Sequence, residues 1–413
     1  MQRLLILGGG TAGTMAANRL RRELHRDEWR ITVVDQSDQH IYQPGLLLIP
    51  FGTCAPHDVA RPRRQTLRDG VELIPARIER VDAEENNVLL VDGRRLPYDY
   101  LVIATGTHTR PDQTPGMLGP GWHRSIHEFY TESGAVALAD ALKDFDGGRL
   151  VVHIVDMPIK FPVAPLEFAF LADAYFRQRG LRDSVEIVFA TPLPGAFTQP
   201  IASARLGAML TDREITLESD FRVERIDPRA KNLVSHDDRK IPFDLLVTVP
   251  LNMGADYVAA SGLGNERNYV PVDRHTFLST AYDNIFAIGD AADLPTSKAG
   301  SVAHYSVEVF VRNFPRYAAG KPMTEKFDGH ASCFIESGGG KGLLIDFNYD
   351  TEPLPGHYPL PAVGPFGLLA ENTRNHWGKL AFRAAYWHLL LPGRPLPLPA
   401  HMPRAGKHEV PQE

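Results

Sequence analysis

A glycine-rich hexapeptide near the amino terminus has the residue types and spacing of a dinucleotide-binding turn. The run Gly8-Gly9-Gly10-Thr11-Ala12-Gly13 follows an apolar stretch and opens a helical pattern. The first glycine permits the tight bend, the second lets backbone approach a pyrophosphate, and the third lets helix and strand pack closely. Asp35 ends the next apolar stretch, 22 residues after Gly13, where a carboxylate can accept hydrogen bonds from ribose hydroxyls. We therefore predict a nucleotide cofactor bound by Gly8, Gly10, Thr11, Ala12, Gly13 and Asp35.

The chain has two cysteines, Cys54 and Cys333. Two are too few for a disulfide-built scaffold, a four-cysteine metal site or an iron–sulfur cluster, so we predict no metal site. If either cysteine is functional, its chemistry is redox chemistry, because a thiolate of lowered pKa is a competent nucleophile. The alternative for each is a small buried apolar side chain.

Two similar units must position these residues. Residues 77–106 align without a gap on residues 222–251, with eleven identities, and residues 4–35 match residues 150–191 as strand, turn, helix and strand. This repeat predicts an α/β protein with two Rossmann-like dinucleotide-binding domains. We expect the cofactor domain to comprise residues 1–110 and 265–325, the second domain residues 111–264, and a C-terminal segment residues 326–413.

The turn of the second unit, within 153–168, has none of the glycines that a pyrophosphate requires. Met157 and its neighbours fill that space with side chains, Pro158 and Pro162 offer no N–H donors, and Asp156 would repel phosphate. This turn predicts that the second domain lacks a working pyridine-nucleotide site and that electrons arrive from another donor.

Composition excludes other classes of function. Lys and Arg total 44 against 50 for Asp and Glu, a net charge of −6, so no global field favours nucleic acid. The amino terminus has no signal-peptide cleavage pattern and too few apolar residues for a spanning helix, so we expect a cytoplasmic protein.

Further pieces specify the cofactor. Thr105-Gly106 ends a strand, Gly289-Asp290 lies at a strand-to-helix turn, and with the first glycine turn they resemble the two-dinucleotide-binding-domain flavoproteins. In those proteins the first domain holds FAD, so the resemblance implies FAD here, with Thr105, Gly106, Gly289 and Asp290 among its ligands.

Several motifs make the resemblance more specific. The chain up to about residue 406 resembles sulfide:quinone oxidoreductase and flavocytochrome sulfide dehydrogenases, through "IYQPGLLLIPFG", "MPIK", "APLEFAFLADAYFRQRGLRD", "IFAIGDAADLPTSKAGSVAH" and "GHASCFIESGGGKGLLIDFNYD". The resemblance implies oxidation of sulfide, or of a small thiol donor, at a cysteine pair beside FAD, and transfer of electrons to membrane quinone. It also places Gln43 and Pro44 along the flavin.

The chain departs from this family at two cysteine positions. Cys333 matches one cysteine of the family's redox pair, but Phe161 stands at the other, and His127 stands where some members attach the flavin covalently. We therefore weigh Cys333 acting alone against a redox pair of Cys54 with Cys333, whose feasibility depends on strict disulfide geometry.

Other polar residues near the expected flavin have open roles. The family match places Lys298 where a cation and a helix amino terminus would stabilise reduced flavin; a solvent-exposed lysine is the alternative. Glu167 and His127 could relay protons, or Glu167 could simply pair with a neighbouring base.

The segment 375–391, "NHWGKLAFRAAYWHLLL", predicts an amphipathic helix. We expect one face to carry Trp377, Leu380, Ala381, Ala384, Trp387 and Leu391, with Lys379, Arg383 and Tyr386 largely opposite. Such a helix suits the headgroup region of a membrane, with a core-packing helix or a dimer contact as the alternatives. Phe366 and Phe382 are our candidates for the quinone site, and we expect a disordered tail after Pro392.

The resulting expectation is a peripheral FAD enzyme on the cytoplasmic side of the plasma membrane. An anionic lipid surface is a possible partner of the basic run 60–68, although a solvated face explains that run as well. A homo-oligomer is also possible. The rival functions are a type-II NADH:quinone dehydrogenase and a non-catalytic flavoprotein that has lost the cysteine pair.

Overall fold

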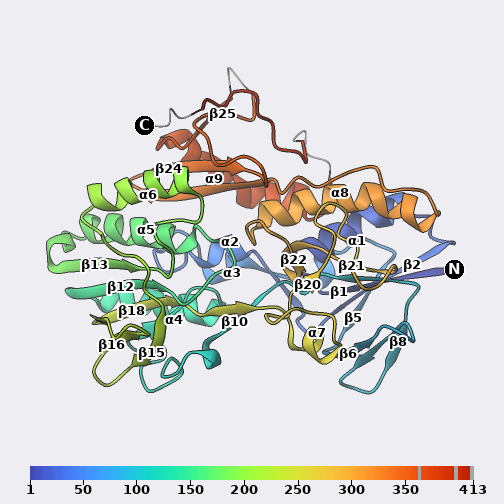
Figure 1. Ribbon diagram of the computed structural model, residues 1–413, viewed down its shortest axis with the longest axis horizontal. Coiled ribbons are helices and arrows are strands. Elements are labelled where there is room, and N and C mark those ends of the chain that lie inside the picture. Colours follow the sequence, from blue (N-terminus) through green and yellow to red (C-terminus); the bar gives the residue numbers. More distant parts are fainter. Residues whose placement is uncertain (361–363, 395–398, 410–413) are drawn as a thin grey trace.

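A computed structural model describes residues 1–360, 364–394 and 399–409. The amino-terminal unit contains a five-stranded parallel sheet in the order β21-β9-β1-β2-β5 (Figure 1). Its strands are β1 (Gln2–Leu7), β2 (Trp29–Asp35), β5 (Val71–Pro75), β9 (Tyr100–Ile103) and β21 (Ile285–Ala287). Helices α1 (Thr11–Glu23) and α8 (Gly300–Ala318) belong to this unit. Because β21 pairs with β9 in parallel, the chain returns to its first sheet after the second unit.

The second unit repeats this plan with a five-stranded parallel sheet in the order β11-β18-β12-β13-β14. Its strands are β11 (Ile126–His127), β12 (Gly148–Ile154), β13 (Val185–Ala190), β14 (Thr216–Glu218) and β18 (Leu245–Val249), and its helices are α4 (Glu132–Asp144), α5 (Ala164–Gln178) and α6 (Pro200–Asp212). All five residues of β18 are buried, as expected of a central parallel strand covered on both faces. The predicted fold class is confirmed, while the domain boundaries themselves stay a prediction.

The sequence repeat appears in the structure as two copies of one three-stranded antiparallel meander. The first copy comprises β6 (Ile78–Asp82), β7 (Asn87–Leu90) and β8 (Arg95–Pro97), and the second comprises β15 (Val223–Asp227), β16 (Asn232–Ser235) and β17 (Lys240–Pro242). Each first strand has an irregular register at the same place, between Ile78 and Arg80 and between Val223 and Arg225. The carboxylates of Asp99 and Asp244, also equivalent, accept the backbone N–H of Arg3 and of Arg149, respectively.

Short elements join the two units and border the cofactor region. Strands β3 (Gln39–Ile41) and β4 (Ala60–Pro62) pair, as do β10 (His108–Arg110) with β19 (Leu251–Met253) and β20 (Val270–Pro271) with β22 (Ala292–Asp293). The short helices are α2 (Gln43–Leu46), α3 (Pro56–Val59), α7 (Asp256–Ala260) and the 3₁₀ turns η1 (Arg63–Thr66), η2 (Pro111–Gln113), η3 (Arg182–Ser184) and η4 (Gly289–Ala291).

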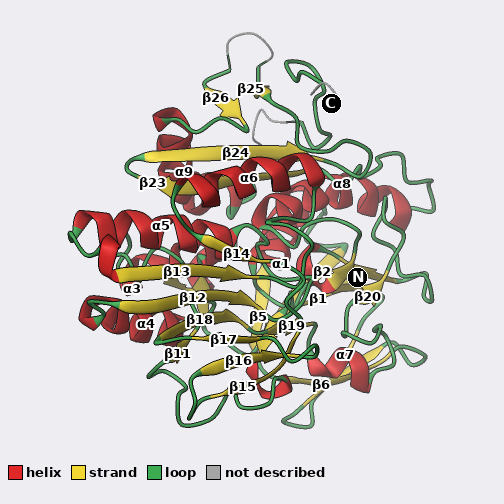
Figure 2. Cartoon of the chain, turned by 60° about the vertical axis from the view of Figure 1, so that its left-hand side comes forward, coloured by secondary structure: helices red, strands yellow, loops and turns green. Residues whose placement is uncertain are grey.

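The C-terminal segment forms a third layer, built from a four-stranded sheet and one helix. Its strands are β23 (Ala331–Gly338), β24 (Lys341–Phe347), β25 (Gly356–Tyr358) and β26 (Phe366–Leu368). Helix α9 (Thr373–Ala385) continues into the π-helical turn η5 (Tyr386–Leu390). Figure 2 shows β23 and β24 above α5, and α5 packs directly against β23. Among the described residues, no helix is both long and apolar enough to cross a lipid bilayer.

The sequence predicted a disordered tail. Residues 395–398 and 410–413 of that tail lie outside the described part of the chain, but residues 399–409 are anchored to the C-terminal sheet. The Lys407 ammonium lies 2.6 Å from Asp346 Oδ2, and both side chains are buried. His330 Nε2 lies 2.7 Å from Asp346 Oδ1, while its Nδ1 lies 3.3 Å from the carbonyl oxygen of Ala400. The proline-rich composition of the tail does not predict this anchoring, because the charged contact depends on a single lysine.

Replacing Lys407 with methionine should therefore destabilise the fold. The buried Asp346 carboxylate keeps His330 but loses its second charged partner, which we expect to cost about 2 kcal/mol. Thermal unfolding of the purified protein should show a lower midpoint for Lys407→Met and an unchanged one for Lys326→Met, which alters an exposed lysine. Equal midpoints for both variants would show that the tail contributes nothing to stability.

Candidate functional site

The predicted glycine turn lies at the carboxyl end of β1 and forms part of a cavity of about 520 Å³. Gly8 has φ +98°, and a Cβ there would lie 2.5 Å from the carbonyl oxygen of Ala104. A Cβ on Gly13 would lie 1.9 Å from the carbonyl oxygen of Gly8. These contacts mean that only glycine permits the turn and the close approach of α1 to the strands.

Two helix amino termini point at this cavity. The N-cap residue of α1 is Gly10 and that of α8 is Ala299, and neither provides a side-chain cap. Gly10, Ala299 and Gly300 all line the cavity, so N–H groups of both first turns are open to a ligand. Such termini stabilise negative charge, which fits the diphosphate of FAD.

Most predicted cofactor residues line this one cavity. The lining includes Gly8, Gly10, Thr11, Ala12, Asp35, Gln43, Pro44, Thr105, Gly106, Asp290 and Lys298. Gly13 and Gly289 are not lining residues; a Cβ on Gly289 would lie 2.9 Å from the Ala12 Cβ, so this glycine lets η4 approach α1. The residues present therefore fit FAD, although the role of each one stays a prediction.

Asp35 supports the glycine turn from the end of β2. Its Oδ2 accepts the backbone N–H of Gly9 at 2.7 Å, and its Oδ1 accepts that of Ser37 at 2.9 Å. Because a carboxylate has about four acceptor positions, both oxygens can still accept ribose hydroxyls. The predicted ribose contact is compatible with this geometry and stays a prediction.

Sequence reasoning missed Arg63, which it assigned to a solvated basic run. The Arg63 side chain is buried and donates to the carbonyl oxygens of Gly9, Gln39 and Ser37, while its Nη2 lies 3.3 Å from Asp35 Oδ1. Arg64, the next residue, is exposed. The two arginines differ because the tertiary structure places carbonyl oxygens that need a donor around Arg63 and not around Arg64.

In the second unit, a salt bridge occupies the turn that would bind a second nucleotide. Arg267 Nη2 lies 2.6 Å from Asp156 Oδ2, and Arg267 Nη1 donates to the carbonyl oxygen of Met157 at 2.7 Å. Arg267, from a later part of the same chain, therefore holds the turn after β12 in place. The turn therefore has a salt bridge in the place where a nucleotide-binding turn would have glycines with free backbone N–H groups.

Phe161, at the position of a family cysteine, lines the cavity in an unusual conformation. Its φ is +54°, a left-handed value that is rare for a bulky residue and is often found at functional sites. Its N–H donates to the carbonyl oxygen of Lys298 at 2.6 Å, and its ring centroid lies 5.0 Å from Lys379 Nζ. The loop thus presents an aromatic side chain to the cavity at the position where the resemblance stated from sequence motifs implies a cysteine.

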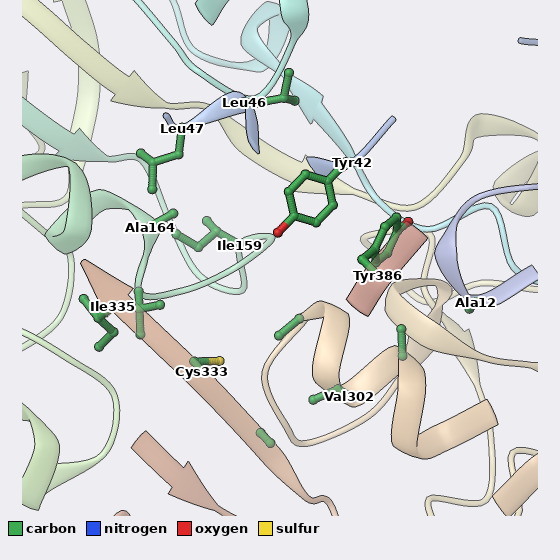
Figure 3. Close-up of a cluster of buried hydrophobic side chains, with 14 of the residues drawn as sticks. Ala12, Tyr42, Leu46, Leu47, Ile159, Ala164, Val302, Cys333, Ile335 and Tyr386 are labelled. Carbon is green, nitrogen blue, oxygen red and sulfur yellow. The ribbon is translucent and has the colours of Figure 1, made fainter. Parts of the chain in front are cut away.

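Cys333 lies on β23 and is not among the residues that line the cavity. Figure 3 shows it in an apolar cluster with Ile335, Ala164 and Val302, and its exposed fraction is 3%. Burial raises the pKa of the Cys333 thiol to about 12, although the Lys379 ammonium favours the thiolate. The thiol is therefore protonated at neutral pH in this conformation.

Both cysteines are free thiols with different neighbours. Cys54 Sγ lies 3.5 Å from Arg383 Nη1, and burial raises its pKa. Arg383 also lies 3.3 Å from Asp58. The structure therefore gives no support to a disulfide between Cys54 and Cys333.

A buried ion pair lies close to Cys333. Lys379 Nζ is 2.5 Å from Glu167 Oε1 and 2.7 Å from Oε2, and it also donates to the carbonyl oxygen of Phe334 at 3.1 Å. Burial raises the pKa of Glu167 to about 7 against the opposing effect of the Lys379 charge. Of the two alternatives for Glu167, the structure provides the partner base, and a proton relay stays a prediction.

This ion pair contradicts the predicted orientation of the C-terminal helix. Lys379 and Tyr386, expected on the outer face, are buried, whereas Trp377 is 63% exposed and Ala381 and Ala384 are exposed. Tyr386 lines the cavity, and its hydroxyl lies 2.8 Å from Thr11 Oγ1 and 2.7 Å from His40 Nε2. Lys379 and Tyr386 turn inward because Glu167, Thr11 and His40 offer partners there, which a hydrophobic pattern cannot reveal. The rest of the prediction holds in part, since Arg383 is exposed and Trp387 and Leu391 are buried.

Of the remaining candidates, Phe382 lines the cavity, but Phe366 does not and instead packs against Phe334, with ring centroids 5.1 Å apart. His127 is buried in β11 beside His123 and is not a lining residue. Lys298 lines the cavity but directs its ammonium to the carbonyl oxygens of Asp290 and Ala292, at 2.9 and 3.1 Å. Sequence reasoning missed Lys160, another cation that lines the cavity; its place beside the singled-out Phe161 was the available signal.

Comparisons with known proteins agree with this architecture. The family model described as pyridine nucleotide-disulphide oxidoreductase matches residues 2–152 and 165–308. The mitochondrial sulfide:quinone oxidoreductase of Mus musculus is 25% identical, covering 94% of this chain and 89% of that protein. The corresponding protein of Schizosaccharomyces pombe is 27% identical with the same coverage.

Among solved structures, the sulfide:quinone oxidoreductase of Aquifex aeolicus superposes with a TM-score of 0.82 at 20% identity, covering 95% of this chain and 92% of that one. These findings confirm the resemblance stated from sequence motifs, and the family explains the glycine turn, the paired units and the cavity together. The chain belongs to the pyridine nucleotide-disulphide oxidoreductase family and is an FAD-dependent oxidoreductase.

Proposed function

We propose that this enzyme oxidises sulfide, or a related small thiol, and passes the electrons to a quinone. The observation that carries the proposal is the thiol of Cys333 next to a buried Lys379–Glu167 pair. Relatives named sulfide:quinone oxidoreductase align over 94% of the chain, including this C-terminal part of the site.

In this proposal the cofactor and the residues of the chain have distinct roles. FAD, when bound, supplies a two-electron relay between donor and acceptor. The glycine turn and the two helix amino termini would hold its diphosphate. Lys379 favours the thiolate form of Cys333, and Glu167, with its pKa of about 7, can take up or release a proton near neutral pH. Forming an S–S bond between sulfide and the thiol releases two electrons and two protons.

The turn of the second unit argues against the rival NADH:quinone dehydrogenase. Asp156 and Arg267 pair in the position where a nucleotide diphosphate would need open glycine backbone. The type II NADH:quinone oxidoreductase of Haemophilus influenzae is 24% identical over 78% of this chain. We therefore place sulfide ahead of NADH as the donor.

The proposal includes a peripheral location on the cytoplasmic face of the plasma membrane. Trp377 on the outer side of α9 and Leu360 are 63% and 58% exposed, which suits contact with a lipid interface. Arg374 and Arg64 are exposed cations that could meet anionic lipid. Phe382 and Tyr386, which line the cavity, are our candidates for the quinone contact, and a homo-oligomer remains part of the hypothesis.

The expected result of the direct test is rapid loss of the visible flavin absorption on anaerobic addition of sulfide. Cys333→Ala should slow this reduction by at least about 100-fold, because the sulfur acceptor is gone. Cys54→Ala, which removes the other thiol, should reduce at the parental rate and serves as the matched control.

NADH in a parallel cuvette separates the rival functions. Bleaching by NADH and not by sulfide would overturn the proposal in favour of the dehydrogenase. Bleaching by neither donor would favour a flavoprotein that has kept the fold and lost the reaction, as the aromatic Phe161 and the buried, protonated Cys333 would then suggest.

A further inference from the structure

Two lysines reach the cofactor cavity where the second unit meets the η4 turn. The backbones of Lys160 and Lys298 form a β-bridge, and both residues line the cavity. Burial lowers the pKa of each lysine, and the Asp290 carboxylate opposes the shift in both. They therefore flank Asp290 from two chain segments.

The Lys298 ammonium is already used by the protein. It donates to two carbonyl oxygens of the η4 region and lies 3.6 Å from the centroid of the Tyr269 ring. These contacts fix η4 against the rest of the unit. Lys298 is in this geometry a positioning residue, because its ammonium already interacts with backbone carbonyl oxygens and an aromatic face.

Lys160 differs because its backbone is fixed while its ammonium is not engaged. Its N–H donates to Asn252 Oδ1 at 3.1 Å, and the N–H of the next residue, Phe161, donates to the carbonyl oxygen of Lys298. Across residues 1–360, 364–394 and 399–409, Lys160 Nζ has no hydrogen bond or salt bridge. Glu128, the other carboxylate near it, already accepts the N–H groups of Tyr130 and Thr131.

Lys160 is partly exposed at the cavity wall, and an ammonium there with no protein partner is best satisfied by an anion or a strong dipole of the ligand. We propose that Lys160, and not Lys298, is the cation that acts on bound FAD and stabilises the negative charge that its ring system gains on two-electron reduction. A cation at the wall of a site of low dielectric stabilises such charge far more than water would. Lys160 thereby raises the reduction potential of the cofactor.

The test is the two-electron reduction potential of FAD in the holoenzyme, measured anaerobically by equilibration with a reference dye. For Lys160→Met we expect the ratio of reduced to oxidised flavin at a fixed potential to fall at least tenfold, which is about 30 mV for a two-electron couple. Lys160→Arg should stay close to the parental potential. Lys143→Met, which removes an exposed lysine of α4, is the matched control.

Lys298→Met separates the two roles. We expect it to lose FAD more readily on dilution, because η4 is released, while the flavin that remains shows a smaller shift of potential than in Lys160→Met. An unchanged potential in Lys160→Met, or a larger shift in Lys298→Met, would overturn the assignment. Loss of FAD by Lys160→Met but not by Lys160→Arg would also count against it, since Lys160 would then hold the cofactor rather than tune it.

This inference depends on FAD binding and not on the proposed electron donor. The potential is measured without sulfide or quinone. If sulfide fails to reduce the enzyme while Lys160→Met still lowers the potential, the proposed function fails and the assignment of Lys160 stands.

Discussion

Gly13→Ala should produce a folded protein that purifies without FAD. The added Cβ would lie 1.9 Å from the carbonyl oxygen of Gly8 and 3.3 Å from the Ala104 Cβ, so α1 must move away from the glycine turn. The displaced atom is backbone, which no side-chain rotation can relieve. Because the amino terminus of α1 opens onto the cavity, this movement would disrupt the expected diphosphate site.

The measurement is the visible flavin absorption per mole of purified protein, with circular dichroism as a check on folding. In an ordinary helix interior, replacing glycine with alanine stabilises by roughly 0.5–1 kcal/mol, so helix propensity predicts the opposite sign. Gly207→Ala in α6 is the matched control, since its Cβ would meet only the Ala196 Cβ at 4.0 Å. A full complement of FAD in Gly13→Ala would show that the predicted turn does not hold the cofactor.

Lys379→Met should destabilise the protein strongly and in a pH-dependent manner. Removing the ammonium leaves the Glu167 carboxyl buried without its partner, a change that typically costs about 3–5 kcal/mol. At pH 8 the carboxyl must either stay ionised and unpaired or take up a proton. At pH 6 protonation is easier, so the loss should be smaller there.

The sign follows from the pKa of Glu167, which burial raises to about 7. The folded state therefore holds a proton that the unfolded state releases near the ordinary carboxyl pKa of about 4.3. The stabilisation linked to this proton is fully present below that ordinary pKa and is lost as the pH rises through about 7. Lys379→Met should raise the pKa of Glu167 further, so the stabilisation linked to its proton should be lost at a higher pH than in the parental protein.

Urea unfolding of the FAD-bound variants at pH 6 and pH 8 measures both effects. The double variant Lys379→Met with Glu167→Gln should recover much of the stability and lose the pH dependence, because no buried charge remains. Lys326→Met controls for loss of an exposed lysine. Equal destabilisation at both pH values would show that Glu167 does not titrate in this range.

The sequence located the repeat and the cofactor turn well because both depend on short spacings along the chain. The meander strands of the two units have boundaries 145 positions apart, as in the aligned sequence. The glycine turn needs three residues of the right type within six positions, and β1 and α1 follow from the flanking patterns. Neighbouring residues suffice for such predictions.

The orientation of α9 could not be predicted in this way. Counting apolar residues placed Lys379 on the solvent side, but its partner Glu167 lies on α5, 212 residues earlier. Arg63 and Lys407 are similar cases: Arg63 donates to carbonyl groups that include that of Gly9 in the glycine turn, and Lys407 pairs with the Asp346 carboxylate. A charged side chain is buried only where a distant segment supplies its partner.

By itself, then, the sequence determined the α/β class, the duplicated units, the FAD turn and the family, all through local patterns and motif resemblance. Only the tertiary structure decided which charges face the cavity, that the Lys298 ammonium donates to backbone carbonyl groups while that of Lys160 does not, and that Cys333 is a buried, protonated thiol. The physical reason is that electrostatic partnership and burial depend on distances in space, and the residues concerned are far apart along the chain.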